Sequence, residues 1–248
     1  MTEFTIKRDG FKLYCVLEKP NLKKCPVVIM HHGFGGYIRN GDNGIFTALS
    51  ERLLKSGIAS VRFDFGGRGK SSGEYKDVNL FTEINDAIAI LEYVKKLDFV
   101  TEVYILGHSQ GGVVGGMVAG YYADVVKKLV LLAPAALLKE DAQRGRCFDA
   151  RYDTNHIPDT VTVCGKEMGG HFFRIAKSLP IYEVTGQFTN PALIVGGMQD
   201  GVVTRHSLEK YEKVLKKGRL IVYPHIDHGM AGADREDMLK EIISFLKA

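Results

Sequence analysis

The chain has 248 residues, of which 45% are hydrophobic and 25% are charged. This composition fits one α/β domain with an insertion, or at most two small domains. Its 33 basic and 29 acidic residues are spread along the chain and leave a net charge of +4, too small an excess to indicate a nucleic-acid partner. No apolar run reaches membrane-spanning length, and the start lacks the h-region of a signal peptide, so we expect a cytoplasmic protein without a membrane partner.

Four cysteines are scattered along the chain without CxxC spacing, at Cys15, Cys25, Cys147 and Cys164. Such spacing predicts reduced thiols rather than a disulfide framework or a metal site. A homodimer is compatible with the sequence.

The first half of the chain alternates between predicted strands and helices. Alternating apolar residues at 3–18 predict a hairpin that turns at 8–10, and apolar runs predict strands at 26–30, 58–63, 103–106 and 128–133. Helical spacing predicts helices at 44–56 and 82–97, and a small-residue segment after Gly111 is long enough for a third. This regular alternation is typical of a mostly parallel, doubly wound α/β sheet.

The alternation breaks at 134–185, a segment with several aromatic residues and a strand-like run at 160–163. Because it follows a sheet strand, we predict that it lies over the carboxyl edge of the sheet as a lid. An insertion with a core of its own is the alternative. Strands at 191–197 and 219–223 and helices at 205–217 and 238–246 then restore the pattern. The sequence thus predicts a core at 1–133 and 186–248 and a small lid at 134–185, inserted between strands 6 and 7.

A G-x-S-x-G pentapeptide, Gly107-His108-Ser109-Gln110-Gly111, joins the strand at 103–106 to the segment that follows. Between a strand and a helix, this pattern is typical of a nucleophile elbow. The turn is so sharp that Ser109 must adopt a strained backbone conformation, and only glycine fits two residues to either side of it. Because the pentapeptide also occurs by chance, its catalytic interpretation depends on partners further along the chain.

A serine nucleophile needs a base, and the base needs an anion that fixes its tautomer. Asp200 directly follows the strand at 191–197 and His228 follows the next strand, so both are predicted at the same sheet edge as Ser109. His225 is an alternative base, but it directly abuts the end of the strand, whereas His228 has the reach. Asp227 is an alternative acid, but because it is adjacent to His228 in the sequence, its side chain points away from that histidine. We therefore predict Ser109, Asp200 and His228 as the catalytic set.

The glycine-dense loop at 31–36 follows an early strand and leaves backbone amides close to the predicted site. In an acyl-transfer enzyme, the amides of Phe34 and Gln110 would form the oxyanion hole. A tight loop with packed histidines is the alternative. His31 and His32 lack a third ligand at suitable spacing, so no metal and no cofactor are predicted.

Gly69-Lys70-Ser71 matches the end of a phosphate-binding P-loop. The motif requires a glycine five residues before Gly69, however, and Asp64 stands there. We therefore predict a structural turn beside the site and not an NTPase.

Over nearly its whole length the chain resembles the α/β-hydrolases, and more closely the bacterial cinnamoyl (feruloyl) esterases. The first three of the following segments are shared widely among hydrolases, and the last two are more specific: His32-Gly33-Phe34, Ser60-Val61-Arg62-Phe63-Asp64-Phe65, Gly107-His108-Ser109-Gln110-Gly111-Gly112, Leu131-Leu132-Ala133-Pro134-Ala135-Ala136 and Pro180-Ile181-Tyr182-Glu183-Val184.

The resemblance implies an α/β-hydrolase fold and hydrolysis of esters of hydroxycinnamic acids such as ferulic, p-coumaric and caffeic acid. It implies a small lid over the acyl pocket, with a lid acid near Asp141 that recognises the phenolic hydroxyl. His32, Gly33, Phe148 and Phe172 are the other substrate-binding residues it suggests, although Phe148 and Phe172 stand where more polar side chains are typical.

Other functions fit the same residues. A general carboxylesterase, a thioesterase or an acylglycerol lipase would use the same Ser, Asp and His without preferring a planar aromatic acyl group. A non-catalytic ligand receptor of this fold is a further alternative, although an intact set of three residues argues against it. Fold alone does not identify the substrate.

Overall fold

An eight-stranded sheet forms the centre of the computed structural model, which describes residues 1–38 and 44–248. Its strand order is β1-β2-β4-β3-β5-β6-β11-β12. The strands are β1 (Thr2–Arg8), β2 (Phe11–Glu18), β3 (Cys25–His31), β4 (Ala59–Phe63), β5 (Val100–His108), β6 (Val126–Leu132), β11 (Ala192–Gly197) and β12 (Gly218–Tyr223).

The first two strands form the predicted hairpin, and its turn residues Asp9 and Gly10 both have positive φ, at 47° and 86°. This combination is required by the tight turns that join antiparallel strands. β2 pairs antiparallel with β4, and β4, β3, β5, β6, β11 and β12 pair in parallel. The prediction of a mostly parallel α/β sheet is therefore confirmed.

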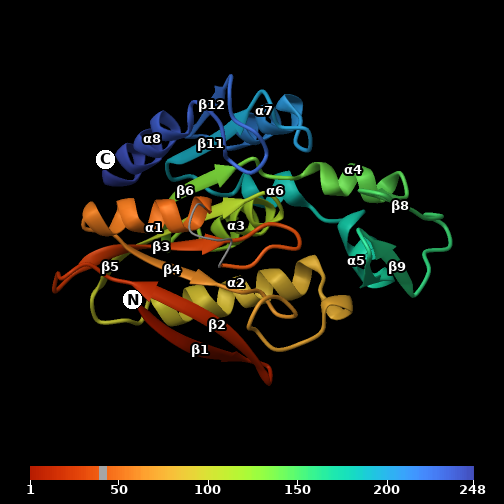
Figure 1. The fold of residues 1–248 in the computed structure, drawn as a ribbon, viewed down its shortest axis with the longest axis horizontal. Helices are drawn as coiled ribbons and strands as arrows, with labels where there is room; N and C mark the ends of the chain where they lie inside the picture. Colours follow the sequence, from red (N-terminus) through yellow and green to blue (C-terminus); the bar gives the residue numbers. More distant parts are fainter. Residues whose placement is uncertain (39–43) are drawn as a thin grey trace.

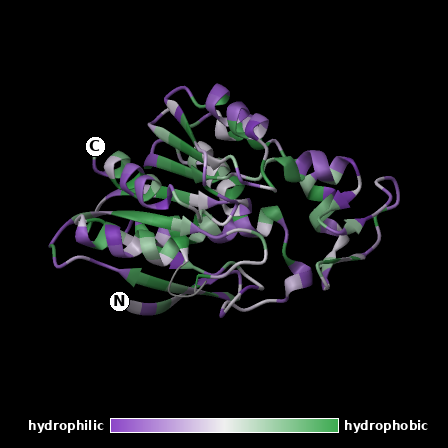
Figure 2. Cartoon of the chain, turned by 45° about the horizontal axis from the view of Figure 1, so that its top comes forward, coloured by the Kyte–Doolittle hydropathy of each residue, from purple (hydrophilic) through white to green (hydrophobic). Residues whose placement is uncertain are grey.

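The helices that cover this sheet are α1 (Ile45–Lys55), α2 (Leu80–Val94), α3 (Gln110–Tyr121), α7 (Arg205–Val214) and α8 (Arg235–Lys247). All of them except α3 are amphipathic, with the mixed hydrophilic and hydrophobic faces that Figure 2 shows around the more apolar strands, whereas α3 is buried over nearly its whole length. α2 begins two residues before its predicted start because Asn79 Oδ1 accepts hydrogen bonds from the amides of Phe81 and Thr82, at 2.9 and 3.0 Å. Thr82 Oγ1 accepts from the Asn79 amide in return, which completes a capping box.

The direction of the chain across the sheet reverses at β3. From β3 the chain crosses to β4 on one side, and from β4 it returns across β3 to β5 on the other. Since such crossovers are right-handed, α1 and α2 lie on opposite faces of the sheet. A reversal of this kind leaves a crevice beyond the carboxyl ends of the two diverging strands, here β3 and β5, where ligands bind in open α/β sheets.

The segment between β6 and β11 contains three helices and two short hairpins. These are α4 (Leu137–Gln143), β7 (Arg146–Cys147), β8 (Ala150–Arg151), β9 (Thr160–Val163), β10 (Lys166–Gly169), α5 (Gly170–Ala176) and α6 (Ile181–Thr185). In Figure 1, α4, α5, β8 and β9 lie beyond the arrowheads of β3, β4 and β6, at the carboxyl edge of the sheet. We call residues 137–176 the insertion, because α6 packs against α3 and α7 of the core.

Buried side chains of the insertion, among them Met168, Phe172 and Phe173, belong to the same apolar cluster as the sheet. The insertion therefore has no separate core, contrary to the alternative that the sequence left open. Within the described residues, no helix is long and apolar enough to cross a membrane.

The turn after β4, where a P-loop was rejected, is organised by the buried carboxylate of Asp64. Its two oxygens accept hydrogen bonds from the amides of Ile38 and Lys70, each at 2.8 Å. A Cβ atom at Gly69 would lie 2.1 Å from the same carboxylate, so the close approach requires glycine. The turn leads into a short 3₁₀ helix, η1 (Tyr75–Asp77), and is structural, as predicted.

Candidate active site

Ser109 sits between β5 and α3 with φ 56° and ψ −124°, a strained conformation for a residue other than glycine. A Cβ atom at Gly107 would lie 2.2 Å from the carbonyl oxygen of Gly111, and one at Gly111 would lie 2.3 Å from that of His31. Even at Gly33, an added Cβ would lie 3.0 Å from Cβ of Ser109. Backbone crowding thus explains the glycines of the pentapeptide.

Ser109, His228 and Asp200 form a continuous hydrogen-bonded chain. Ser109 Oγ lies 3.0 Å from His228 Nε2, and His228 Nδ1 lies 2.9 Å from Asp200 Oδ2. The Asp200 side chain is 2% exposed and the His228 side chain is 25% exposed. This is the arrangement in which an imidazole takes a proton from serine while a buried carboxylate fixes its tautomer.

The carboxylate of Asp200 is held as an anion. Burial alone would raise its pKa, but the hydrogen bond with His228 and those from the amides of Val203 and Val202, at 2.8 and 2.7 Å, outweigh burial and bring the pKa below its ordinary value. Asp200 can therefore stabilise a positive charge on His228.

A second histidine, His108, supports the loop that carries His228. Its Nε2 lies 2.7 Å from the carbonyl oxygen of His228, so it donates a hydrogen bond there. Burial lowers the pKa of His108 to about 4, which leaves its ring neutral at neutral pH. Sequence reasoning treated position 108 only as the variable residue of the pentapeptide and missed this contact.

The two residues predicted to form the oxyanion hole both lie beside the nucleophile. Phe34 follows β3 and Gln110 opens α3, and both line the same pocket as Ser109. The first amides of a helix have no acceptor within that helix and lie at its positive end. The amide of Gln110 is therefore suited to hold an oxyanion.

The side chain of Gln110 is held by a hydrogen bond to a buried acid. Gln110 Nε2 donates to Glu83 Oε2 at 2.7 Å, and Glu83 is 3% exposed. Burial raises the pKa of Glu83 to about 7, while the nearby Arg68 guanidinium and the Gln110 amide act in the opposite direction. From the sequence, Glu83 appeared only as a helical residue within 82–97.

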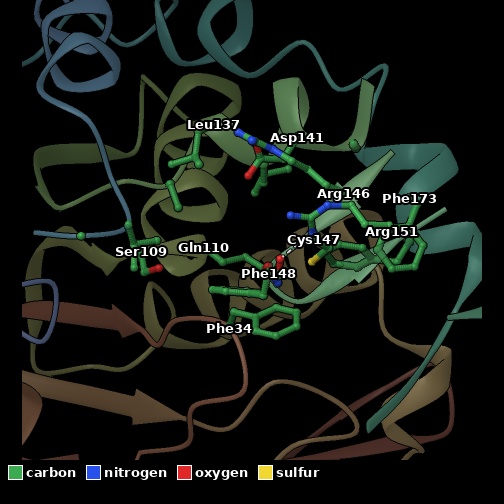
Figure 3. Close-up of a pocket in the computed structure, with 16 residues that line it drawn as sticks. Phe34, Ser109, Gln110, Leu137, Asp141, Arg146, Cys147, Phe148, Arg151 and Phe173 are labelled. Atoms are coloured by element: carbon green, nitrogen blue, oxygen red, sulfur yellow. Dashed lines mark hydrogen bonds and ion pairs between the residues drawn. The ribbon is translucent and has the colours of Figure 1, made fainter. Parts of the chain in front are cut away.

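A pocket of about 290 Å³ opens onto Ser109 and is bounded on its far side by the insertion (Figure 3). Its wall includes a group of aromatic side chains: the Phe34 ring lies 5.2 Å from that of Phe148 and 6.3 Å from that of Phe172, centroid to centroid. The polar groups on the insertion side are Asp141, Arg146, Cys147 and Arg151.

The predicted substrate-binding residues divide into two groups. Asp141, Phe148 and Phe172 line the pocket, whereas His32 and Gly33 are not among its lining residues. Both ring nitrogens of His32 are occupied: Nε2 accepts from the Phe65 amide at 3.1 Å, and Nδ1 lies 3.0 Å from the Gly33 carbonyl oxygen. His32 therefore holds backbone groups of two loops through its ring, and its contact with substrate stays a prediction.

Asp141 is also less available than the sequence suggested. Its Oδ1 accepts from Nε of Arg146 at 2.8 Å and lies 2.7 Å from Nη2 of the same residue. Neighbouring Cys147 is a neutral thiol, because burial raises its pKa to about 12. All four cysteines are free, and the described residues contain no group of three or more His, Cys, Asp or Glu that could hold a metal ion.

Comparison with known proteins agrees with this fold and arrangement. Residues 23–160 match the model of a family described as serine aminopeptidase, S33. A structure of Est1E from Butyrivibrio proteoclasticus with ferulic acid bound is similar over 98% of this chain and 97% of that chain, with a TM-score of 0.92 and 33% identity. A second structure of Est1E has a TM-score of 0.88 and 31% identity over the same shares.

A curated relative, the bifunctional esterase/perhydrolase DCH of Acinetobacter calcoaceticus, is 26% identical over 285 residues and covers 99% of both chains. The family match covers more than half of the chain, and the likeness to Est1E extends over nearly all of it. This chain is therefore a serine hydrolase of the α/β-hydrolase superfamily that belongs to the bacterial cinnamoyl (feruloyl) esterase family.

Proposed function

We propose that this protein is an esterase that hydrolyses hydroxycinnamoyl esters through an acyl-enzyme on Ser109. His228 is the general base and acid, and Asp200 orients it. The amides of Phe34 and Gln110 form the oxyanion hole, and the insertion acts as the lid over the acyl pocket.

In the first half-reaction, Ser109 Oγ attacks the ester carbonyl carbon while its proton passes to His228 Nε2. The carbonyl oxygen becomes an oxyanion and accepts hydrogen bonds from the two amides. His228 then returns the proton to the leaving alcohol, which frees the acyl-enzyme. In the second half, His228 deprotonates a water that attacks the acyl carbon, and Ser109 leaves with the proton as the acid is released.

The observation that carries the substrate class is the aromatic pocket beside Ser109. Phe34, Phe148 and Phe172 place their rings around a space that suits a planar acyl group, because aromatic rings attract one another in stacked and edge-to-face arrangements. The similarity to Est1E, whose structure holds ferulic acid, supports the same class.

The test is the kcat/KM for methyl ferulate, methyl p-coumarate and a matched aliphatic methyl ester, with Ser109→Ala as the blank. We expect the cinnamates to be preferred by about tenfold or more, which corresponds to roughly 1.4 kcal/mol at the transition state. Equal or inverted preference would indicate a general carboxylesterase, thioesterase or acylglycerol lipase with the same mechanism. No turnover of any ester, together with no reaction with a fluorophosphonate, would indicate a non-catalytic receptor.

A further inference from the structure

One short hairpin, β7–β8, supplies four lining residues of the acyl pocket, of which only Phe148 enters the proposed function. Arg146, Cys147 and Arg151 stand on its strands, and Phe148 stands in its turn. Figure 3 shows both arginines on the side of the pocket away from Ser109, with Phe148 and Phe173 to either side of them. A substituent on the far end of an acyl group would therefore meet this hairpin.

The turn of this hairpin contains a residue in a strained backbone conformation. Phe148 has φ 48°, a left-handed conformation that bulky side chains rarely adopt and that glycine or asparagine usually fills in such turns. In this conformation its ring pairs with Phe34. Arg151 Nη1 donates to the carbonyl oxygens of Phe148 and Ala150, at 2.8 and 2.7 Å, and so fixes the turn. Strain of this kind clusters at ligand-binding sites.

Among the side chains that line the pocket at the hairpin, positive charge is in excess. Arg146 and Arg151 are direct cross-strand partners, and like charges in that position destabilise a strand pair. Asp141 pairs with Arg146 and, within the part of the chain that the structure describes, is the only acid that lines the pocket, so this lining carries two cations and one anion. Asp149, in the turn, also lies near Arg151, but its exposed carboxylate accepts from the Cys164 amide and does not line the pocket.

We propose that the far end of the acyl pocket binds an anionic group on the acid part of the substrate, with Arg151 as its principal partner and Arg146, held by Asp141, beside it. The inference rests on the proposed function and extends it: the substrates include monoesters of aromatic dicarboxylic acids. A guanidinium matches a carboxylate with two parallel hydrogen bonds, and a bound anion would offset the repulsion between the two arginines.

The test uses two substrates of nearly equal shape that differ in charge. They are cinnamates methylated at the propenoate end that carry either a carboxylate or a carboxamide at ring position 4. We expect kcat/KM to favour the carboxylate by about tenfold or more, because hydrogen bonds to charged groups are stronger than neutral ones. The preference should shrink as salt is added, since the arginines are partly exposed.

Variants test whether the hairpin causes the preference for the carboxylate over the carboxamide substrate. In Arg151→Gln the carboxylate-to-carboxamide ratio should fall toward one, and in Arg151→Lys part of it should remain. Arg144→Gln removes the same charge from an exposed position at the end of α4, outside the pocket lining, and should keep the wild-type ratio. A wild-type ratio at or below one, or an unchanged ratio in Arg151→Gln, would overturn the inference.

Failure of the proposed function would be recognised separately, with p-nitrophenyl acetate as the reporter substrate. Turnover of that reporter without turnover of methyl cinnamate would contradict the proposed substrate class. The free 4-carboxycinnamate would still test the hairpin as an inhibitor of the reporter reaction. If 4-carboxycinnamate inhibits more strongly than 4-carbamoylcinnamate and this difference disappears in Arg151→Gln, the inference is supported. Equal inhibition by the two compounds overturns it.

Discussion

Two glycines, Gly111 at the carboxyl edge of the sheet and Gly165 in the insertion that faces it, differ in the space around them. At the edge, backbone atoms lie so close that a Cβ atom at Gly111 would meet two carbonyl oxygens, at 2.3 and 2.4 Å. In the insertion, Gly165 has no heavy atom within 4 Å of such a Cβ, and the pocket is formed by side chains such as Phe148 and Arg151. Gly111 thus leaves no room for a side chain, whereas Gly165 does. Crowding is not confined to the edge, since a Cβ atom at Gly170 of the insertion would lie 1.9 Å from the carbonyl oxygen of Pro158.

The largest effect should come from the hydrogen-bonded chain at the edge. His228→Ala should lower kcat by about 10⁶ and Asp200→Asn by about 10⁴, because the first removes the base and the second leaves it in the wrong tautomer. Asp141→Asn in the insertion should act mainly on KM for hydroxycinnamates. Steady-state kinetics on methyl p-coumarate separate the two regions, and a small loss of kcat in His228→Ala would exclude the proposed mechanism.

Acid should unfold the protein through histidines buried at the same edge. Burial lowers the pKa of His31 to about 3 and the pKa values of His32 and His108 to about 4, from an ordinary 6.5. Below pH 6.5 the unfolded chain therefore binds protons that the folded chain does not. The free energy of unfolding falls as pH decreases from about 6.5 toward 4.

Two buried acids oppose this trend. The pKa of Glu83 is raised from 4.5 to about 7 and that of Asp86 is raised from 3.8, in both cases chiefly by burial. Between pH 4.5 and 7 the folded chain keeps a proton on Glu83 that the unfolded chain has lost, so this acid contributes stability that grows as pH falls. Because three histidines lower the stability and only two acids raise it, the free energy of unfolding should fall by on the order of 1 kcal/mol for each unit that the pH decreases.

Urea unfolding at pH 7, 6 and 5 measures this dependence. His31→Gln should give a shallower slope because one buried titrating group is gone. His156→Gln is the matched control in the insertion, since the His156 side chain is 87% exposed, and it should leave the slope unchanged. A free energy of unfolding that is flat or rises toward pH 5 contradicts the dominance of the histidines.

Two glycine substitutions compare the regions directly. Gly111→Ala should destabilise the protein by about 3 kcal/mol or more and lower kcat, because α3 and the Gln110 amide must move away from β3. Gly165→Ala should cost only about 1 kcal/mol, the strain of an alanine at φ 74°, and leave kcat/KM unchanged. Denaturant unfolding and turnover of p-nitrophenyl acetate provide both readouts, and similar losses in the two variants would refute the contrast.

Sequence reasoning succeeded where local backbone requirements fix the structure. The strand, turn and helix around Ser109 and the parallel sheet were predictable because buried strands, glycine spacing and helix caps leave distinct patterns. The hairpin β7–β8 left none, since its strands have two residues each and Phe148 is an unusual turn residue. The contacts of His108 and Glu83 depend on segments far apart in the chain, so no local pattern reports them.

The smallest effect concerns Phe148, where two opposing contributions to stability nearly cancel. Phe148→Asn relieves left-handed strain of about 1–2 kcal/mol and loses a ring pair worth about 0.5–1.5 kcal/mol. We therefore expect a Tm within about 3 °C of wild type, together with about a tenfold lower preference for cinnamate over aliphatic esters. Phe172→Ala is the contrast: its ring is 3% exposed, and its loss should cost about 3–5 kcal/mol. A large drop in Tm for Phe148→Asn would mean that this ring stabilises the insertion rather than selecting the acyl group of the substrate.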